Sequence, residues 1–175
     1  GIYYATDKGA DIINMSFAGV DFDTNSIKEF NKALEYAYSK NVLVIAAAGN
    51  LYSSGNPITY PASLPGVIAV GSINYSGELT DFTNRGPYVS FVAPGKGIHS
   101  MDSKGNILTI DGTSVSAPIL SGLAALYLSL NPAGGRDSLI KDLSSNITDT
   151  GSEKGYGEII STNMLNFINM DSKNN

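Results

Sequence analysis

The sequence predicts an α/β fold with a mostly parallel sheet flanked by helices. Residues 42–48 form a continuous apolar run, which is typical of a parallel strand buried on both faces. Residues 11–17 read as another central strand of the same sheet. The segment between them has apolar residues every three or four positions, as an amphipathic helix does. Strand, helix and strand in this order predict a right-handed crossover.

The crossover helix has clear signals at both ends. Residues 23–26, Asp-Thr-Asn-Ser, form a capping cluster, and Asn41 is expected to close the helix before the second strand. The residues that give the helical period are Ile27, Phe30, Ala33, Leu34 and Ala37.

The second half of the chain continues the pattern with shorter elements. Residues 67–71 and 89–92 are predicted strands, and residues 101–110 contain a hairpin turn. Residues 137–143 are predicted to form a short helix after the Asn-Pro break that follows the longest apolar stretch.

Ser114 lies in a run of small residues, 111–118, immediately before that apolar stretch. Because Pro118 lacks an N–H, we expect it in the first turn of the helix, which places Ser114 near the N-terminus. Free N–H groups and the helix dipole there suit a nucleophile, but a serine in this position also suits an ordinary N-cap. Local physics leaves both interpretations open. The residues at helical spacing are Leu120, Leu123, Ala124, Tyr127 and Leu128.

Composition excludes several classes of protein. The chain has 175 residues, enough for one domain, with 42% hydrophobic and 15% charged residues and a net charge of −5. It has no basic patch for nucleic acid and no cysteine for disulfides, thiolate metal sites or cysteine catalysis. We find no signal peptide at the start and expect no apolar run long enough to span a membrane.

Several motifs, in order, resemble the subtilisin-like serine proteases (subtilases, peptidase S8). Residues 112–118, Gly-Thr-Ser-Val-Ser-Ala-Pro, resemble the signature around the family's nucleophile, and residues 42–50 resemble the strand that ends in its oxyanion-hole asparagine. The resemblance covers about residues 1–165 and implies that residues 1–168 are the C-terminal portion of a subtilase catalytic domain, followed by a polar tail, 169–175. Other matching segments are 12–19, 60–62, 67–71, 82–86 and 92–95.

The resemblance implies a role for particular residues. Ser114 would be the nucleophile, and Asn50 would donate to the oxyanion, although an asparagine in a strand-end turn is also common. Ala18 stands where the family usually has glycine, and with Leu51 it suggests an apolar first specificity pocket of limited depth. The implied substrate-binding residues are Ser16, Phe17, Ala18, Ala48, Gly49, Thr59 and Thr113.

The family's aspartate and histidine motifs are missing from this chain. His99 is its one histidine, and it falls on a segment that is not catalytic in the family. We therefore expect a sheet incomplete at its N-terminal side, and serine endopeptidase activity only as part of a complete domain. The chain alone should be inactive and should associate with a complementary half carrying Asp and His, or with itself. The rival hypothesis is a non-catalytic module that binds peptides or a propeptide.

The resemblance also implies features outside the cleft. Residues 2–8 should be the last turns of a helix, 155–160 a small hairpin motif and 162–168 the final helix. No metal ligands or cofactor can be identified, although relatives often bind calcium. We expect no nucleic-acid partner, and an extracellular or cell-envelope location in a bacterium.

Overall fold

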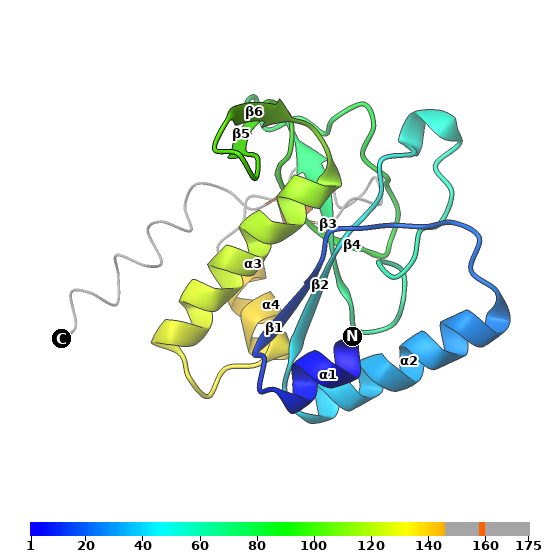
Figure 1. Ribbon diagram of the computed structural model, residues 1–175, viewed down its shortest axis with the longest axis vertical. Helices are drawn as coiled ribbons and strands as arrows, with labels where there is room; N and C mark the ends of the chain where they lie inside the picture. The colour runs from blue at the N-terminus through cyan, green and yellow to red at the C-terminus, as the bar shows by residue number, and fades with distance from the viewer. Residues whose placement is uncertain (146–157, 160–175) are drawn as a thin grey trace.

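A five-stranded parallel sheet, in the order β1-β2-β3-β4-β7, runs through the described part of the chain (Figure 1). The computed structural model describes residues 1–145 and 158–159. The predicted α/β fold is confirmed. The helices described are α1 (Ile2–Asp7), α2 (Thr24–Ser39), the short 3-10 helix η1 (Tyr52–Ser54), α3 (Thr113–Leu130) and α4 (Arg136–Ser145). The strands described are β1 (Ile12–Met15), β2 (Leu43–Ala47), β3 (Ile68–Ile73), β4 (Val89–Pro94), β5 (Ile98–Met101), β6 (Ile107–Ile110) and β7 (Glu158–Ile159).

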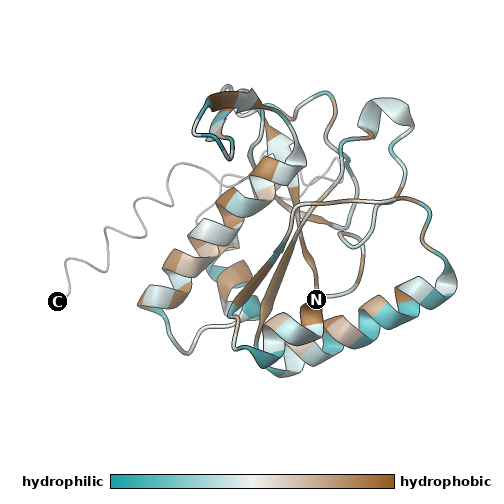
Figure 2. Cartoon of the chain, in the orientation of Figure 1, coloured by the Kyte–Doolittle hydropathy of each residue, from teal (hydrophilic) through white to brown (hydrophobic). Residues whose placement is uncertain are grey.

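Helices cover both faces of this sheet, and β2 shows how the sequence serves both. Leu43, Ile45 and Ala47 pack in one apolar cluster with α3 and α4. Val44 and Ala46 point to the opposite face and pack in a second cluster with α2. Every side chain of β2 is therefore buried, which explains the unbroken apolar run; the strands form the brown centre of Figure 2.

The predicted cap and closure of α2 are both present. The Asp23 carboxylate accepts hydrogen bonds from the backbone N–H groups of Asn25 (2.8 Å) and Ser26 (2.9 Å). The bonds from Ser26 hold the pKa of the Asp23 carboxyl below its ordinary value. At the other end, Asn41 adopts a left-handed conformation (φ +61°) that turns the chain into β2.

The sequence predicts a central strand at residues 11–17, in a sheet that is incomplete at its N-terminal side. β1 lies at the edge of the sheet, with β2 as its one neighbour among the described residues. Ile12 and Ile13 are half-buried and Asn14 is exposed, whereas all of β2 is buried. An apolar run reports how well the two faces of a strand are covered, and it does not report how many strands lie beside it.

The start of α3 also differs from the prediction. The helix begins at Thr113 with Gly112 as N-cap, so Pro118 is its sixth residue and lies in the second turn. Because Pro118 has no N–H, the carbonyl of Ser114 lacks the usual partner four residues on. At the start of the helix, the N–H of Val115 donates to the Gly112 carbonyl (3.2 Å) and closes the first turn.

By length and composition α3 is able to cross a membrane, which corrects the expectation that no segment would qualify. The helix has 18 residues and a mean hydropathy of 1.4, although only 33% of it is buried. Its buried side chains, among them Leu120, Ala124 and Tyr127, pack against the sheet. We therefore interpret α3 as the core helix of this domain.

The last part of the chain is described only at β7. Residues 158–159 pair in parallel with β4, and the rest of the segment predicted as a hairpin motif lies outside the described residues. The predicted final helix, 162–168, and the tail, 169–175, also lie outside them. β5 and β6 form the predicted hairpin as a separate antiparallel pair.

Candidate active site

The carboxyl end of β2 meets the start of α3 through the side chain of Asn50. Its Oδ1 atom accepts hydrogen bonds from the backbone N–H (2.9 Å) and the hydroxyl (2.8 Å) of Thr113. The Thr113 hydroxyl oxygen in turn accepts the N–H of Gly49 (3.1 Å). Residues far apart in the sequence are thereby fixed where parallel α/β sheets place their sites.

These bonds determine which way the Asn50 amide faces. An amide has one acceptor oxygen and one donor nitrogen, and the oxygen is committed to two donors on Thr113. The nitrogen therefore faces the opposite side, toward Ser114. A Cβ atom added to Gly112 would lie 3.1 Å from Asn50 Nδ2 and 3.1 Å from Ser114 Oγ. The amide nitrogen and the hydroxyl therefore border the same small space in front of Gly112.

Ser114 is the second residue of α3, and it does not cap the helix. Gly112 is the N-cap, and because glycine has no side chain, the N-cap residue makes no side-chain hydrogen bond to the first turn. The Ser114 side chain is half-buried, and its hydroxyl makes no hydrogen bond within the described residues. A free hydroxyl at the positive end of a helix dipole is suited to attack an electrophile and to hold the resulting negative charge nearby.

The predicted substrate edge follows β1 and is open. Ser16 is half-buried, Phe17 is 54% exposed and Ala18 is exposed. The next residue, Gly19, exchanges two backbone hydrogen bonds with Tyr60, at 2.9 and 2.8 Å. Those bonds anchor the segment at one end, while no described strand pairs with residues 16–18.

The other predicted substrate-binding residues are buried. Ala48, Gly49, Thr59 and Thr113 have little or no exposed surface. The Thr59 hydroxyl donates to the Ala48 carbonyl (2.5 Å), and its methyl carbon would lie 2.7 Å from a Cβ added at Gly49. The Tyr88 hydroxyl also donates to the Ala48 carbonyl (3.2 Å). Sequence reasoning missed Tyr88, because no motif connects it to this backbone.

His99 lies apart from this arrangement. It is exposed on β5, and its Nδ1 atom is 3.2 Å from the Thr109 hydroxyl on β6. Among the described residues, no side chain that could accept a proton is hydrogen-bonded to Ser114. The site thus contains a candidate nucleophile and a candidate oxyanion donor, while a general base is not among its described residues.

The donor atoms do not suggest a metal centre within the described part of the chain. No three His, Cys, Asp or Glu side chains gather there. Calcium sites take carboxylate, carbonyl and water oxygens, and the described residues supply no group of three carboxylates for one.

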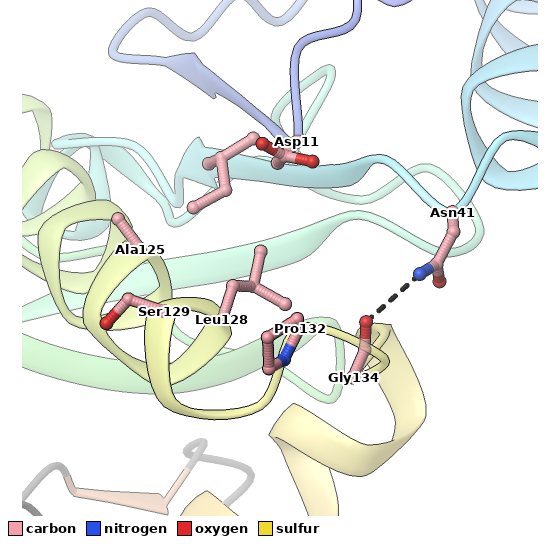
Figure 3. A pocket seen from close by; sticks show the side chains of 8 residues that line it. Asp11, Asn41, Ala125, Leu128, Ser129, Pro132 and Gly134 are labelled. Atoms are coloured by element: carbon pink, nitrogen blue, oxygen red, sulfur yellow. Dashed lines mark hydrogen bonds between the residues drawn. The ribbon is translucent and has the colours of Figure 1, made fainter.

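Two cavities flank the edge strand β1. One, of about 520 Å³, lies between Ile12 and the end of α3, where Leu128 and Ser129 line it (Figure 3). The other, of about 470 Å³, lies on the opposite face of β1 against α1 and α2, and Met15 and Phe30 line it. Apolar side chains are also exposed along α3, namely Ile119, Leu126 and Leu130.

Comparison with known proteins places the sequence in one family. The model of the subtilase family matches residues 1–158. Subtilisin DY from Bacillus licheniformis is 36% identical over 160 residues, covering 90% of this chain and 57% of its own length. A halolysin-like extracellular serine protease, Nep, from Natrialba magadii is 36% identical over 161 residues, covering 90% and 29%.

A solved structure has a similar fold. The prenylagaramide maturation protease PagA superposes with a TM-score of 0.81 at 31% identity, covering 96% of this chain and 64% of that one. The chain thus spans 40% to 57% of the length of the first curated relatives it matches.

Proposed function

Because the chain belongs to the subtilase family, we propose that it carries the nucleophile and the oxyanion hole of a serine endopeptidase. The observation that supports this most is the placement of Asn50 Nδ2 and Ser114 Oγ around one space, each 3.1 Å from the same point in front of Gly112. A carbonyl carbon bound there would meet the hydroxyl while its oxygen meets the amide.

The proposed reaction is acyl transfer through Ser114. Its Oγ attacks the scissile carbonyl, and the oxyanion that forms accepts hydrogen bonds from Asn50 Nδ2 and the Ser114 N–H. A histidine takes the Ser114 proton and passes it to the departing amine, after which water hydrolyses the acyl-enzyme. We propose that this histidine and its orienting aspartate lie outside these 175 residues.

The open edge at residues 16–18 suggests how the substrate is held. An extended peptide would add there as a strand, with main-chain hydrogen bonds supplying affinity. The first specificity pocket would be shallow, because Ala18 brings a methyl group to its wall and the Thr59 methyl fills the space beside Gly49. We propose a preference for small apolar side chains at the residue before the cleaved bond.

The complementary half that carries the aspartate and the histidine would cover β1 and α3. Among the described residues the outer edge of β1 is unpaired, a cavity lies on each side of it, and Ile119 and Leu126 are exposed on α3. Self-association of this chain through the same region is the alternative outcome. Calcium enters no step of this mechanism. The extracellular location named for one relative supports the same location here.

Labelling with a fluorophosphonate probe tests the proposed function. The 175-residue chain would be compared with the full-length natural polypeptide that contains it, and Ser114→Ala would serve as control. We expect labelling of the full-length protein and its loss in Ser114→Ala. A folded full-length protein that does not react would overturn the proposal and favour the rival, a module that only binds peptides. Peptide binding by the unlabelled protein would then be the next measurement.

A further inference from the structure

The residues that lead into α3 are held from outside the helix. The Asp111 carboxylate accepts the N–H of Gly97 (2.7 Å), and Gly112 donates its own N–H to the carbonyl of Gly95 (2.8 Å). Two hydrogen bonds thus join the turn after β4 to the last two residues before Thr113. We call this pair of bonds the Asp111 clamp.

The turn that receives the clamp is itself rigidly placed. Gly95 donates its N–H to the Ile73 carbonyl at the end of β3 (3.0 Å). A side chain at Gly95 would overlap the hydroxyls of Ser72 and Ser116, both of which are fully buried. The turn cannot shift without disturbing the sheet on one side and α3 on the other, so it offers a fixed reference for the residues bonded to it.

The clamp acts on the residue that shapes the site. Gly112 has φ +146°, a conformation that other residues rarely adopt, and it faces both Asn50 Nδ2 and Ser114 Oγ. Rotation of the peptide between Asp111 and Gly112 would therefore change the direction of the Ser114 hydroxyl and N–H relative to Asn50. Bonds on both sides of this peptide oppose that rotation.

We propose that Asp111 is a positioning residue, which holds Gly112 so that Ser114 and Asn50 converge on one carbonyl group. The inference rests on the proposed function, because it assigns Asp111 a part in the same reaction. Asp111 is exposed and does not touch the predicted substrate edge, so its loss should affect the chemical step and leave substrate binding unchanged.

The test compares three variants of the full-length protein on a peptide substrate. In Asp111→Ala we expect kcat to fall by about 10-fold with KM changed by less than about 2-fold, since small misplacements of reacting groups are costly. Asp111→Asn keeps an oxygen acceptor for Gly97 and removes the charge, so its kcat should be close to that of the unsubstituted protein. Asp102→Ala is the matched control. Asp102 is a half-buried carboxylate in the turn between β5 and β6, and it accepts the N–H groups of Lys104 and Asn106.

Amide hydrogen exchange in the same variants reports on the clamp without relying on activity. We expect faster exchange at Gly97 and Gly112 in Asp111→Ala than in Asp102→Ala. Unchanged kcat in Asp111→Ala, or equal losses in Asp111→Ala and Asp111→Asn, would refute the positioning role. If the unsubstituted protein has no turnover, the proposed function fails, and the catalytic meaning of the clamp falls with it. The exchange data test the hydrogen bonds of the clamp by themselves, so a failure of the proposed function can be told apart from a failure of the clamp.

Discussion

The Asn50 side chain accepts the first N–H of the helix that carries Ser114, although the two hydrogen-bonded residues, Asn50 and Thr113, are 63 positions apart in the sequence. One side chain thereby does two things. Its oxygen accepts the first N–H of α3 and the Thr113 hydroxyl, and the direction of those bonds leaves its nitrogen free to face the proposed oxyanion. The stability of the helix start and the proposed catalysis therefore depend on the same amide.

Substitution of Asn50 separates these two effects. Asn50→Ala should lower kcat by about 10²- to 10³-fold, as loss of an oxyanion donor does, and should also lower the melting temperature. Asn50→Asp keeps an acceptor for Thr113 but replaces the donor with a negative oxygen. Asn50→Asp should lose as much activity as Asn50→Ala, but its melting temperature should stay closer to that of the unsubstituted protein. Steady-state kinetics and thermal unfolding of both variants check this, and an active Asn50→Asp protein would contradict the assigned role.

Gly112 should tolerate no side chain. Gly112→Ala places a methyl group 3.1 Å from both Asn50 Nδ2 and Ser114 Oγ, and we expect activity to fall by at least about 10²-fold because the carbonyl is excluded. Gly105→Ala is the control, since Gly105 also has a positive φ (+85°) but open space around it. It should lower stability and leave kcat unchanged. Equal activity losses in the two variants would show that backbone strain, and not the filled space, is responsible.

Thr59 should limit the size of the substrate side chain. Thr59→Ser keeps the hydroxyl that holds the Ala48 carbonyl and removes the methyl beside Gly49. We expect kcat/KM for substrates with one larger apolar side chain to rise by about 10-fold relative to small ones, the scale of one methylene in an apolar pocket. Thr80→Ser, which also removes a buried methyl, is the control, and it should leave the preference unchanged. The same shift in both variants would rule out a specific role for Thr59.

The cap of α2 should make stability depend on pH. The pKa of Asp23 is lowered in the folded protein, chiefly by the hydrogen bonds from Ser26, so its carboxylate stabilises the fold above the unfolded pKa. That contribution is lost as the pH falls through the lowered folded value. Asp23→Ala should therefore melt at a lower temperature than the unsubstituted protein at pH 7, and the difference should shrink below about pH 4. Asp21→Ala, which removes a nearby exposed carboxylate that does not cap α2, is the control for the loss of one negative charge.

The exposed face of α3 should mediate association. In the 175-residue chain alone, Ile119→Lys with Leu126→Lys should increase the monomer fraction in sedimentation velocity, because two apolar contacts are replaced by charges. In the full-length protein the same pair should lower stability. Leu108→Lys, which changes an exposed apolar residue on β6, is the control. A chain that is already monomeric at micromolar concentration would contradict the proposed interface.

The sequence predicted most elements correctly where local signals were strong. The cap at residues 23–26 and the apolar period of α2 placed that helix, and the run at 42–48 placed β2. It misplaced Pro118 within α3. The error has a physical cause: hydrophobic pattern and residue preference describe a segment and its faces, whereas the first residue of a helix depends on what packs beside it.

The sequence by itself determined the family, the succession of strands and helices along the chain, and the residue types that the proposed chemistry uses, since a serine among small residues and an asparagine after a buried strand are local patterns. Only the tertiary structure decided that Asn50 accepts the first N–H of the Ser114 helix, that Gly112 faces both Asn50 and Ser114, and that Asp111 is bonded to Gly97. Those contacts join residues that are distant along the chain. Their geometry follows from how the sheet packs against α3, and no local pattern encodes it.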